Sequence, residues 1–168
     1  IQALTTDQVA GLSTRQVRAI ETTDLAAITT DQIQALSTGS IAAIKTSDVK
    51  ALTTDQVRAI ETDDVVALST GQIQAITTSN IASLTTSQVA AIETTDVAAL
   101  KTSQVVALST GDVAALTTNQ IVSLTTAQVA SLTTGQIGAL TTSQAVAIEN
   151  TDIAALKTSQ IVALSTAN

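Results

Sequence analysis

One octapeptide is repeated along the whole chain without an insertion or a deletion. The first complete copy is Leu4–Gly11 (LTTDQVAG), the second is Leu12–Ala19, and the copies continue to the last residue, Asn168. The consensus is [Leu/Ile]-[Thr/Ser]-Thr-x-[Gln/Asp]-[Val/Ile]-x-Ala, and we number its residues as positions one to eight. A fixed short period indicates an array of units that contact their neighbours, rather than a globular domain. The sequence predicts a single array of about 21 repeats over residues 1–168, expected to be a segment of a longer array.

The eight positions differ in how much they vary from copy to copy. Position three is Thr in every unit but one, where it is Asn150. Position six is Val or Ile except at Leu25 and at Ala145, which Val146 follows as if the apolar residue had moved by one place. Position eight is almost always Ala, whereas positions four and seven vary freely. We expect positions one, six and eight to face the core, and positions four and seven to face solvent.

The repeat is incompatible with one continuous helix. Eight residues at 100° each move an apolar stripe by about 80° per unit, so no single face stays buried. The chain is therefore expected to bend once per unit. Thr5 and Gln8 have the spacing of a capping box, and Leu4 and Val9 have that of a hydrophobic staple. These signals predict a helix of about six residues that ends at position eight, with the corner at positions one and two.

Some units have no Ser or Thr at the helix start. Position two is Glu or Lys in seven units: Glu21, Lys45, Glu61, Glu93, Lys101, Glu149 and Lys157. We expect the Thr or Asn at position three to be the N-cap in these units, one residue later.

A β-solenoid is the alternative fold, because Val, Ile and Thr are good strand residues. Two observations weigh against it. The inward positions eight and one are adjacent, which breaks the alternation of a strand. Gly, which tight arcs use for positive φ, occurs only sporadically. We therefore predict an all-α solenoid, or superhelix, of very short helices, one per 8-residue repeat. Variation among the copies does not reveal how many units make one turn.

The composition restricts the chemistry. The chain has no His, Cys or aromatic residue and a net charge of −7. Ser–His and Cys–His nucleophile pairs are excluded, and so are the usual zinc and haem ligand sets. The acidic charge disfavours nucleic acid, and no apolar run reaches the length of a membrane span. We expect no enzyme activity, no cofactor, no nucleic-acid partner and no membrane insertion.

Four units share Glu at position two with Asp at position five. Paired carboxylates are candidate Ca²⁺ ligands, but the favoured interpretation is a duplicated unit whose acids face water, with the Asp near a helix N-terminus. No metal site is predicted; Glu61, Asp63 and Asp64 are the densest cluster and the best candidates. Lys101 and Lys157 each follow such a Glu by one unit, which suggests surface ion pairs with Glu93 and Glu149.

The octapeptide, as in Ala3–Ala10 and Ala115–Val122, resembles the Leu-Thr-Thr-x-Gln-Val-x-Ala repeat regions of very large bacterial proteins described as secreted or surface-associated and adhesin-like. The resemblance covers the whole chain and implies a structural role at the cell surface or outside the cell: a stalk, a spacer or a filament. The alternative is an adhesin module that presents positions four and seven to a surface or a glycan. We also expect self-association or end-to-end stacking.

Overall fold

The computed structural model describes the backbone of residues 1–167, with side chains to Leu164, as a succession of short α-helices with no β-strand in that range. The all-α prediction is confirmed, and the β-solenoid alternative is wrong. Each unit forms one helix of four to six residues, except that the last helix has ten. The helices are α1 (Thr6–Ala10), α2 (Thr14–Ala19), α3 (Thr22–Ala26), α4 (Thr30–Ala35), α5 (Thr38–Ala42), α6 (Thr46–Val49), α7 (Thr54–Ala59), α8 (Thr62–Val66), α9 (Thr70–Ala75), α10 (Thr78–Ile81), α11 (Thr86–Ala91), α12 (Thr94–Ala99), α13 (Thr102–Ala107), α14 (Thr110–Ala115), α15 (Thr118–Ser123), α16 (Thr126–Ser131), α17 (Thr134–Gly138), α18 (Thr142–Ala147), α19 (Asn150–Ala155) and α20 (Thr158–Ala167).

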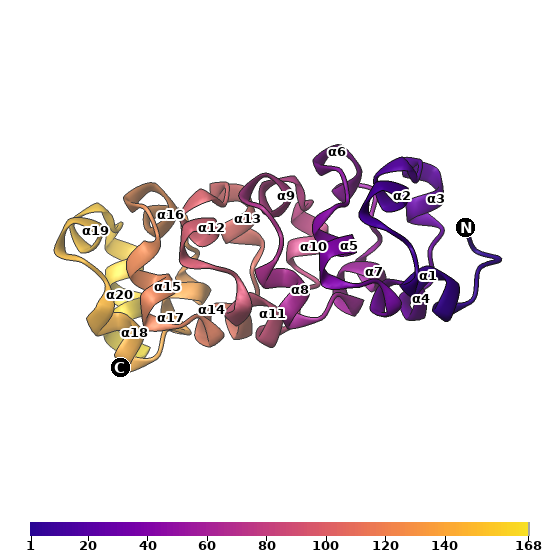
Figure 1. Cartoon of the computed structure of the whole chain (residues 1–168). Helices are drawn as coiled ribbons and strands as arrows, with labels where there is room; N and C mark the ends of the chain where they lie inside the picture. Colours follow the sequence, from indigo (N-terminus) through magenta and orange to yellow (C-terminus); the bar gives the residue numbers. More distant parts are fainter. Residues whose placement is uncertain (168) are drawn as a thin grey trace.

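Three units make one turn of the superhelix. Each helix packs against the helix three units later, as α1 does against α4, α4 against α7 and α17 against α20. One turn, which we call a coil, therefore contains three helices and 24 residues. Figure 1 shows the result, an elongated array with the two termini at opposite ends. The helices form three parallel columns, and consecutive units lie in different columns.

Each helix from α1 to α19 begins one residue after its N-cap, which is position two of the unit. In α1 the Thr5 hydroxyl accepts a hydrogen bond from the Gln8 amide at 3.3 Å, and the Gln8 side chain accepts one from the Thr5 amide at 2.9 Å. The predicted capping box is therefore confirmed. The predicted shift of the N-cap is wrong: Glu21 and Lys45 occupy the N-cap position without a side-chain cap bond, and their helices still begin at position three. Packing on the neighbouring coils fixes the helix start even where the local cap is missing.

Two extended residues form each corner. At the end of α2, Ile20 has φ −61° and ψ 132°, and Glu21 follows with φ −76° and ψ 153°. The Ile20 amide donates to the Val17 carbonyl at 3.1 Å, which closes the last helical turn. No residue of the described chain has positive φ. The corner therefore needs no Gly, which explains why Gly occurs only sporadically in the repeat.

Positions six and one supply a narrow core. Position-six side chains such as Val9, Ile73 and Ile137 are buried, and position-one residues such as Ile60 and Leu132 lie beside them. Position eight is mostly half-buried, so its predicted inward placement holds only partly. Position four is exposed in every described unit, as predicted, and position seven is exposed or half-buried.

The exception at Ala145 is informative. Ala145 still occupies the inward position and is half-buried, whereas Val146 is 83% exposed. The apolar side chain that moved by one place in the sequence therefore does not fill the core. The backbone keeps its register, because the hydrogen bonds between coils fix it independently of this side chain.

Candidate functional site: the glutamine ladder and the outer columns

Position five carries the main polar interaction between coils. The Gln88 side-chain amide Nε2 donates to the carbonyl oxygens of Val57 and Ile60 at 2.8 and 2.7 Å. These carbonyls lie 31 and 28 residues earlier, in the last turn of α7 and at the corner that follows it in the preceding coil. The same 28-residue bond, of 2.6 to 2.9 Å, recurs in ten units, and we call this series the glutamine ladder. Its members are Gln32, Gln56, Gln72, Gln88, Gln104, Gln120, Gln128, Gln136, Gln144 and Gln160.

Each Gln of the ladder bonds at both ends of its amide. Gln88 Oε1 accepts from the Thr85 amide of its own unit at 2.8 Å, while Nε2 reaches the coil below. The side chain is 1% exposed, so every bond it makes replaces a bond to water that burial has removed. The sequence pattern does not predict that position five faces inward. Position five is polar in every unit, but the capping box already explains a polar residue there.

Shorter residues at position five preserve the contact only in part. Asn80 Nδ2 donates to the Leu52 carbonyl at 2.8 Å, and Ser40 Oγ donates to the Leu12 carbonyl at a longer 3.3 Å. An ionised Asp has no donor for these carbonyls. Asp48 instead accepts from the hydroxyl of Thr22 at 2.7 Å. Units with Asp therefore lose the standard link between coils.

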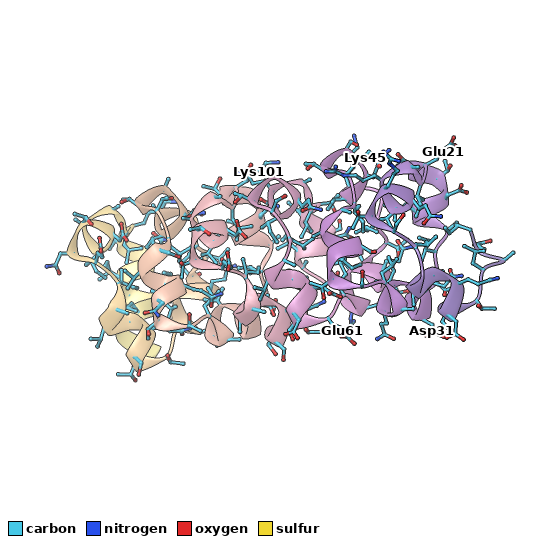
Figure 2. All side chains as sticks on the ribbon, viewed as in Figure 1. Glu21, Asp31, Lys45, Glu61 and Lys101 are labelled. Atoms are coloured by element: carbon cyan, nitrogen blue, oxygen red, sulfur yellow. The ribbon has the colours of Figure 1, made fainter. Side chains whose placement is uncertain are left out.

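The three best candidate site residues lie together on α8 but in different surroundings. Glu61 is the exposed N-cap, Asp63 is exposed in the first turn, and Asp64 at position five is 4% exposed. In Figure 2, Glu61 lies on the opposite edge of the array from Glu21 and Lys45. In the described residues no group of three or more His, Cys, Asp or Glu side chains is placed to hold one metal ion.

The lysines do not form the predicted ion pairs with the preceding Glu residues. In the described residues the one salt bridge joins Lys45 Nζ to Asp48 Oδ2 at 3.2 Å. Lys101 Nζ instead donates to the carbonyl of Gln74 at 2.9 Å. The predicted pairs with Glu93 and Glu149 are wrong because consecutive units lie in different columns.

Asp48 has an altered acidity. The hydrogen bond from Thr22 lowers the pKa of Asp48 below its usual value of 3.8. Burial of the carboxyl opposes this by raising the pKa, and contacts with Lys45 and Ser47 lower it further. The charged form of Asp48 is therefore the one that the fold accommodates.

The outer surface consists of positions two, three, four and seven. Position seven carries exposed valines, of which Val122 and Val146 belong to the adjoining helices α15 and α18 of one column. These two valines also lie in the stretch of residues 113–148, which contains no charged residue. Acidic side chains gather nearer the N-terminus, where exposed Asp31 (Figure 2) occupies position four of α4.

The repeat unit, its capping box and its coil-to-coil contacts can be compared with known proteins. The family model of the ALTTAQ repeat matches the chain five times, at residues 1–38, 25–59, 57–92, 89–126 and 105–142. The chain belongs to the ALTTAQ repeat family. Each match spans more than four octapeptides, so the family model describes a stretch of array longer than one coil. No curated protein matches the ALTTAQ array described here.

The ALTTAQ array has few concave features. No pocket is found in the described residues. None of their helices is long and apolar enough to cross a membrane. The side chains that distinguish one unit from another are therefore on the outer surface and at position five.

Proposed function

We propose that the chain is a structural element: a stalk, a spacer or a filament segment outside the cell or on its surface. The observation that carries this proposal is the glutamine ladder, which repeats one bond at one interval from Gln32 to Gln160. Because each coil bonds only to the coils before and after it, added units lengthen the array without changing its cross-section. The number of units therefore sets the length of the array.

Two further observations support this proposal. The ALTTAQ family match describes a repeat protein. The likeness of the octapeptide to secreted and surface-associated bacterial repeat regions supports the placement outside the cell. A non-enzymatic role agrees with the lack of His and Cys in the sequence.

Small-angle X-ray scattering tests the spacer role. Variants that lack one, two or three complete coils of 24 residues are compared with the full chain. We expect the maximum dimension to fall by about 8–10 Å per coil, the usual distance between packed helices, while the cross-sectional radius of gyration stays constant. A maximum dimension that does not follow the number of coils contradicts the proposal.

Self-association is part of this proposal, with a second copy of the chain as the partner. Gln8 and Gln16, in the first coil, are exposed, whereas every described position-five residue from Gln32 onward is buried. In the part of the chain that the structure describes, the side-chain amide nitrogens of Gln8 and Gln16 donate to no carbonyl oxygen. Stacking of a last coil under a first coil extends the ladder across two molecules. We expect light scattering to show association that Gln8→Glu with Gln16→Glu weakens, because Glu keeps the cap acceptor and removes the donor.

A second candidate function is adhesion, and the exposed valines favour it. Val66, Val106, Val122 and Val146 expose 40 to 83% of their surface at position seven. Val122 and Val146 lie in the uncharged stretch, and exposed apolar side chains there suit the apolar face of a sugar or another uncharged surface. A glycan array tests this function. We expect binding by the full chain that replacement of these valines by Thr removes, and absence of any binding argues for a spacer alone.

A further inference from the structure

A Gln side chain at position five stabilises its unit in two ways. Gln136 Oε1 accepts a hydrogen bond from the Thr133 amide at 2.9 Å, which completes the capping box of α17. Gln136 Nε2 donates to the carbonyl oxygens of Val105 and Leu108 in the preceding coil, at 2.9 and 2.8 Å. The start of one helix and the junction between two coils therefore depend on the same side chain, and a unit without Gln can lose both.

The helices α15–α18 have both contacts in every unit. Each of the four begins with a capping box. Each position-five amide also donates to three carbonyl oxygens of the preceding coil, at 3.0, 3.3 and 2.7 Å in the case of Gln120. The same three bonds recur at Gln128, Gln136 and Gln144. These four consecutive units are the longest run of complete units in the described residues.

The helices α5–α8 have both contacts in one unit only. Position five in the four units is Ser40, Asp48, Gln56 and Asp64. Of these helices α7, the one with Gln, begins with a capping box, whereas α6 and α8 have no side-chain cap bond and α5 has half of the box. The helices without Gln are also shorter, because α5 and α8 have five residues and α6 has four, compared with six in α7.

The junctions between these helices and the preceding coil are weak for the same reason. Ser40 Oγ donates to one carbonyl oxygen of that coil, at a long 3.3 Å. Asp48 accepts one bond from that coil, from Thr22 at 2.7 Å. Thr38 holds the same register below Asp64, and one hydroxyl bond is the most that it can supply, since an ionised Asp has no donor. Three of the four junctions therefore have at most one such bond, compared with three at each junction of α15–α18.

Distance from the ends of the chain favours the opposite order of stability. Four helices precede α5, whereas α19 and α20 alone follow α18 in the described residues. Because the ends of a chain fray first, α18 would open more easily than α5–α8 if position were the only cause. Lower stability in α5–α8 is therefore a signature of the missing contacts.

We propose that α5–α8 is a yield segment, which opens locally while α15–α18 stays folded. Each coil contacts only its neighbours, so the loss of one junction does not have to break the others. Local opening within one protein spans a wide range of free energies and is easiest where few contacts hold the backbone. Under the stalk or spacer role proposed above, on which this use of the segment rests, α5–α8 lengthens under a pulling load and limits the force on the rest of the array.

Hydrogen–deuterium exchange followed by mass spectrometry tests the proposal on the full chain. We expect amides of residues 38–66 to have protection factors about 10–100 times lower than those of residues 118–147, because each missing buried bond changes an opening equilibrium by about five- to tenfold. Equal protection of the two ranges, or lower protection of residues 118–147, overturns the proposal. Exchange is measured without load, so its outcome is independent of the scattering test of the spacer role.

A variant with two added Gln residues tests the cause. Ser40→Gln with Asp64→Gln supplies the missing side chain in α5 and α8. We expect the protection of residues 38–66 to rise about tenfold, while that of residues 118–147 stays unchanged. The matched control is Asp63→Gln, which places the same side chain at the exposed position four of α8 and is expected to change neither range. No rise in the first variant, or an equal rise in the control, overturns the proposal.

Gln136→Asp is the reverse test. This change removes a side chain that donates to three carbonyl oxygens of the preceding coil, while Asp112 shows that Asp at this position keeps the bond to the amide of its own N-cap. We expect the protection of residues 118–147 to fall about tenfold and that of residues 38–66 to stay unchanged. An equal fall in both ranges means that the array opens as one cooperative unit. That result overturns the proposal, and so does unchanged protection of residues 118–147.

Discussion

The side-chain amide of Gln88 lies 2.7 Å from the carbonyl oxygen of Ile60, 28 residues earlier in the chain. This contact joins one coil to the next and recurs along the array. A residue that the sequence marks as a local cap is therefore also the polar link that holds successive coils in register.

Replacement of Gln88 by Leu is expected to destabilise the array by about 2–4 kcal/mol, because buried carbonyls of the coil below lose their donor. Gln8→Leu is the matched control. Gln8 is also a capping-box residue, but it is exposed and contacts no earlier coil. Its replacement is expected to cost about 1 kcal/mol or less. Urea unfolding followed by circular dichroism measures both, and equal losses contradict a role of the ladder in stability.

Replacement of Ala145 by Val is expected to stabilise the array by about 0.5–2 kcal/mol, because Val is the common residue at this inward position. The control is Val146→Ala, which removes a side chain that is 83% exposed and is expected to change stability by less than about 0.5 kcal/mol. The change in Tm measures both. A lower Tm for Ala145→Val means that the core cannot accommodate two more methyl groups.

Acidification is expected to weaken the contact between Thr22 and Asp48. Because the folded-state pKa of Asp48 is lowered, its contribution to stability is complete above the unfolded-state pKa near 3.8. The contribution is lost as the pH falls through the lower folded-state pKa. Thr22→Val removes the largest cause of the shift, so NMR titration of the Asp48 carboxyl should give a higher pKa in this variant. An unchanged pKa assigns the shift to Lys45 and Ser47.

Deletion of one whole unit is expected to preserve the fold, whereas deletion of half a unit is not. Removal of residues 100–107 moves every later unit to the next column, but the 28-residue ladder bonds form again because the units are equivalent. Removal of residues 100–103 places apolar residues at polar positions and interrupts the ladder. Helicity at 222 nm per residue and Tm distinguish the two variants. A similar loss of helicity and Tm in both variants means that the contacts depend on particular pairs of units, rather than on the repeat.

Much of the local structure follows from the sequence. Thr5 and Gln8 predict the capping box, and the apolar residues at positions one and six predict the core. The burial of Gln88 does not follow, because the capping box gives its polar group a complete local explanation. The burial of Asp64 is missed for another reason, because a carboxylate near a helix N-terminus is expected to face water. The local hydrogen bond between Gln88 and Thr85 does not reveal the second bond, from Gln88 Nε2 to the coil below, that the buried amide makes.

The predicted ion pairs failed for a physical reason. Sequence alone suggests that Lys101 meets Glu93, its neighbour by one unit, because the number of units per turn is unknown. The structure packs each helix against the third one along the chain, so Lys101 meets Gln74 instead.

The amino-acid sequence is enough to define the unit, because the cap, the apolar positions and the corner all lie within one octapeptide. Two features come only from the packing of the coils: three units close one coil, and position five is buried, including the Asp side chains from Asp48 onward. The reason is the difference in sequence separation between the two kinds of contact. Capping and periodicity act over a few residues, whereas the coil is closed by contacts about 28 residues apart, whose interval no single unit encodes.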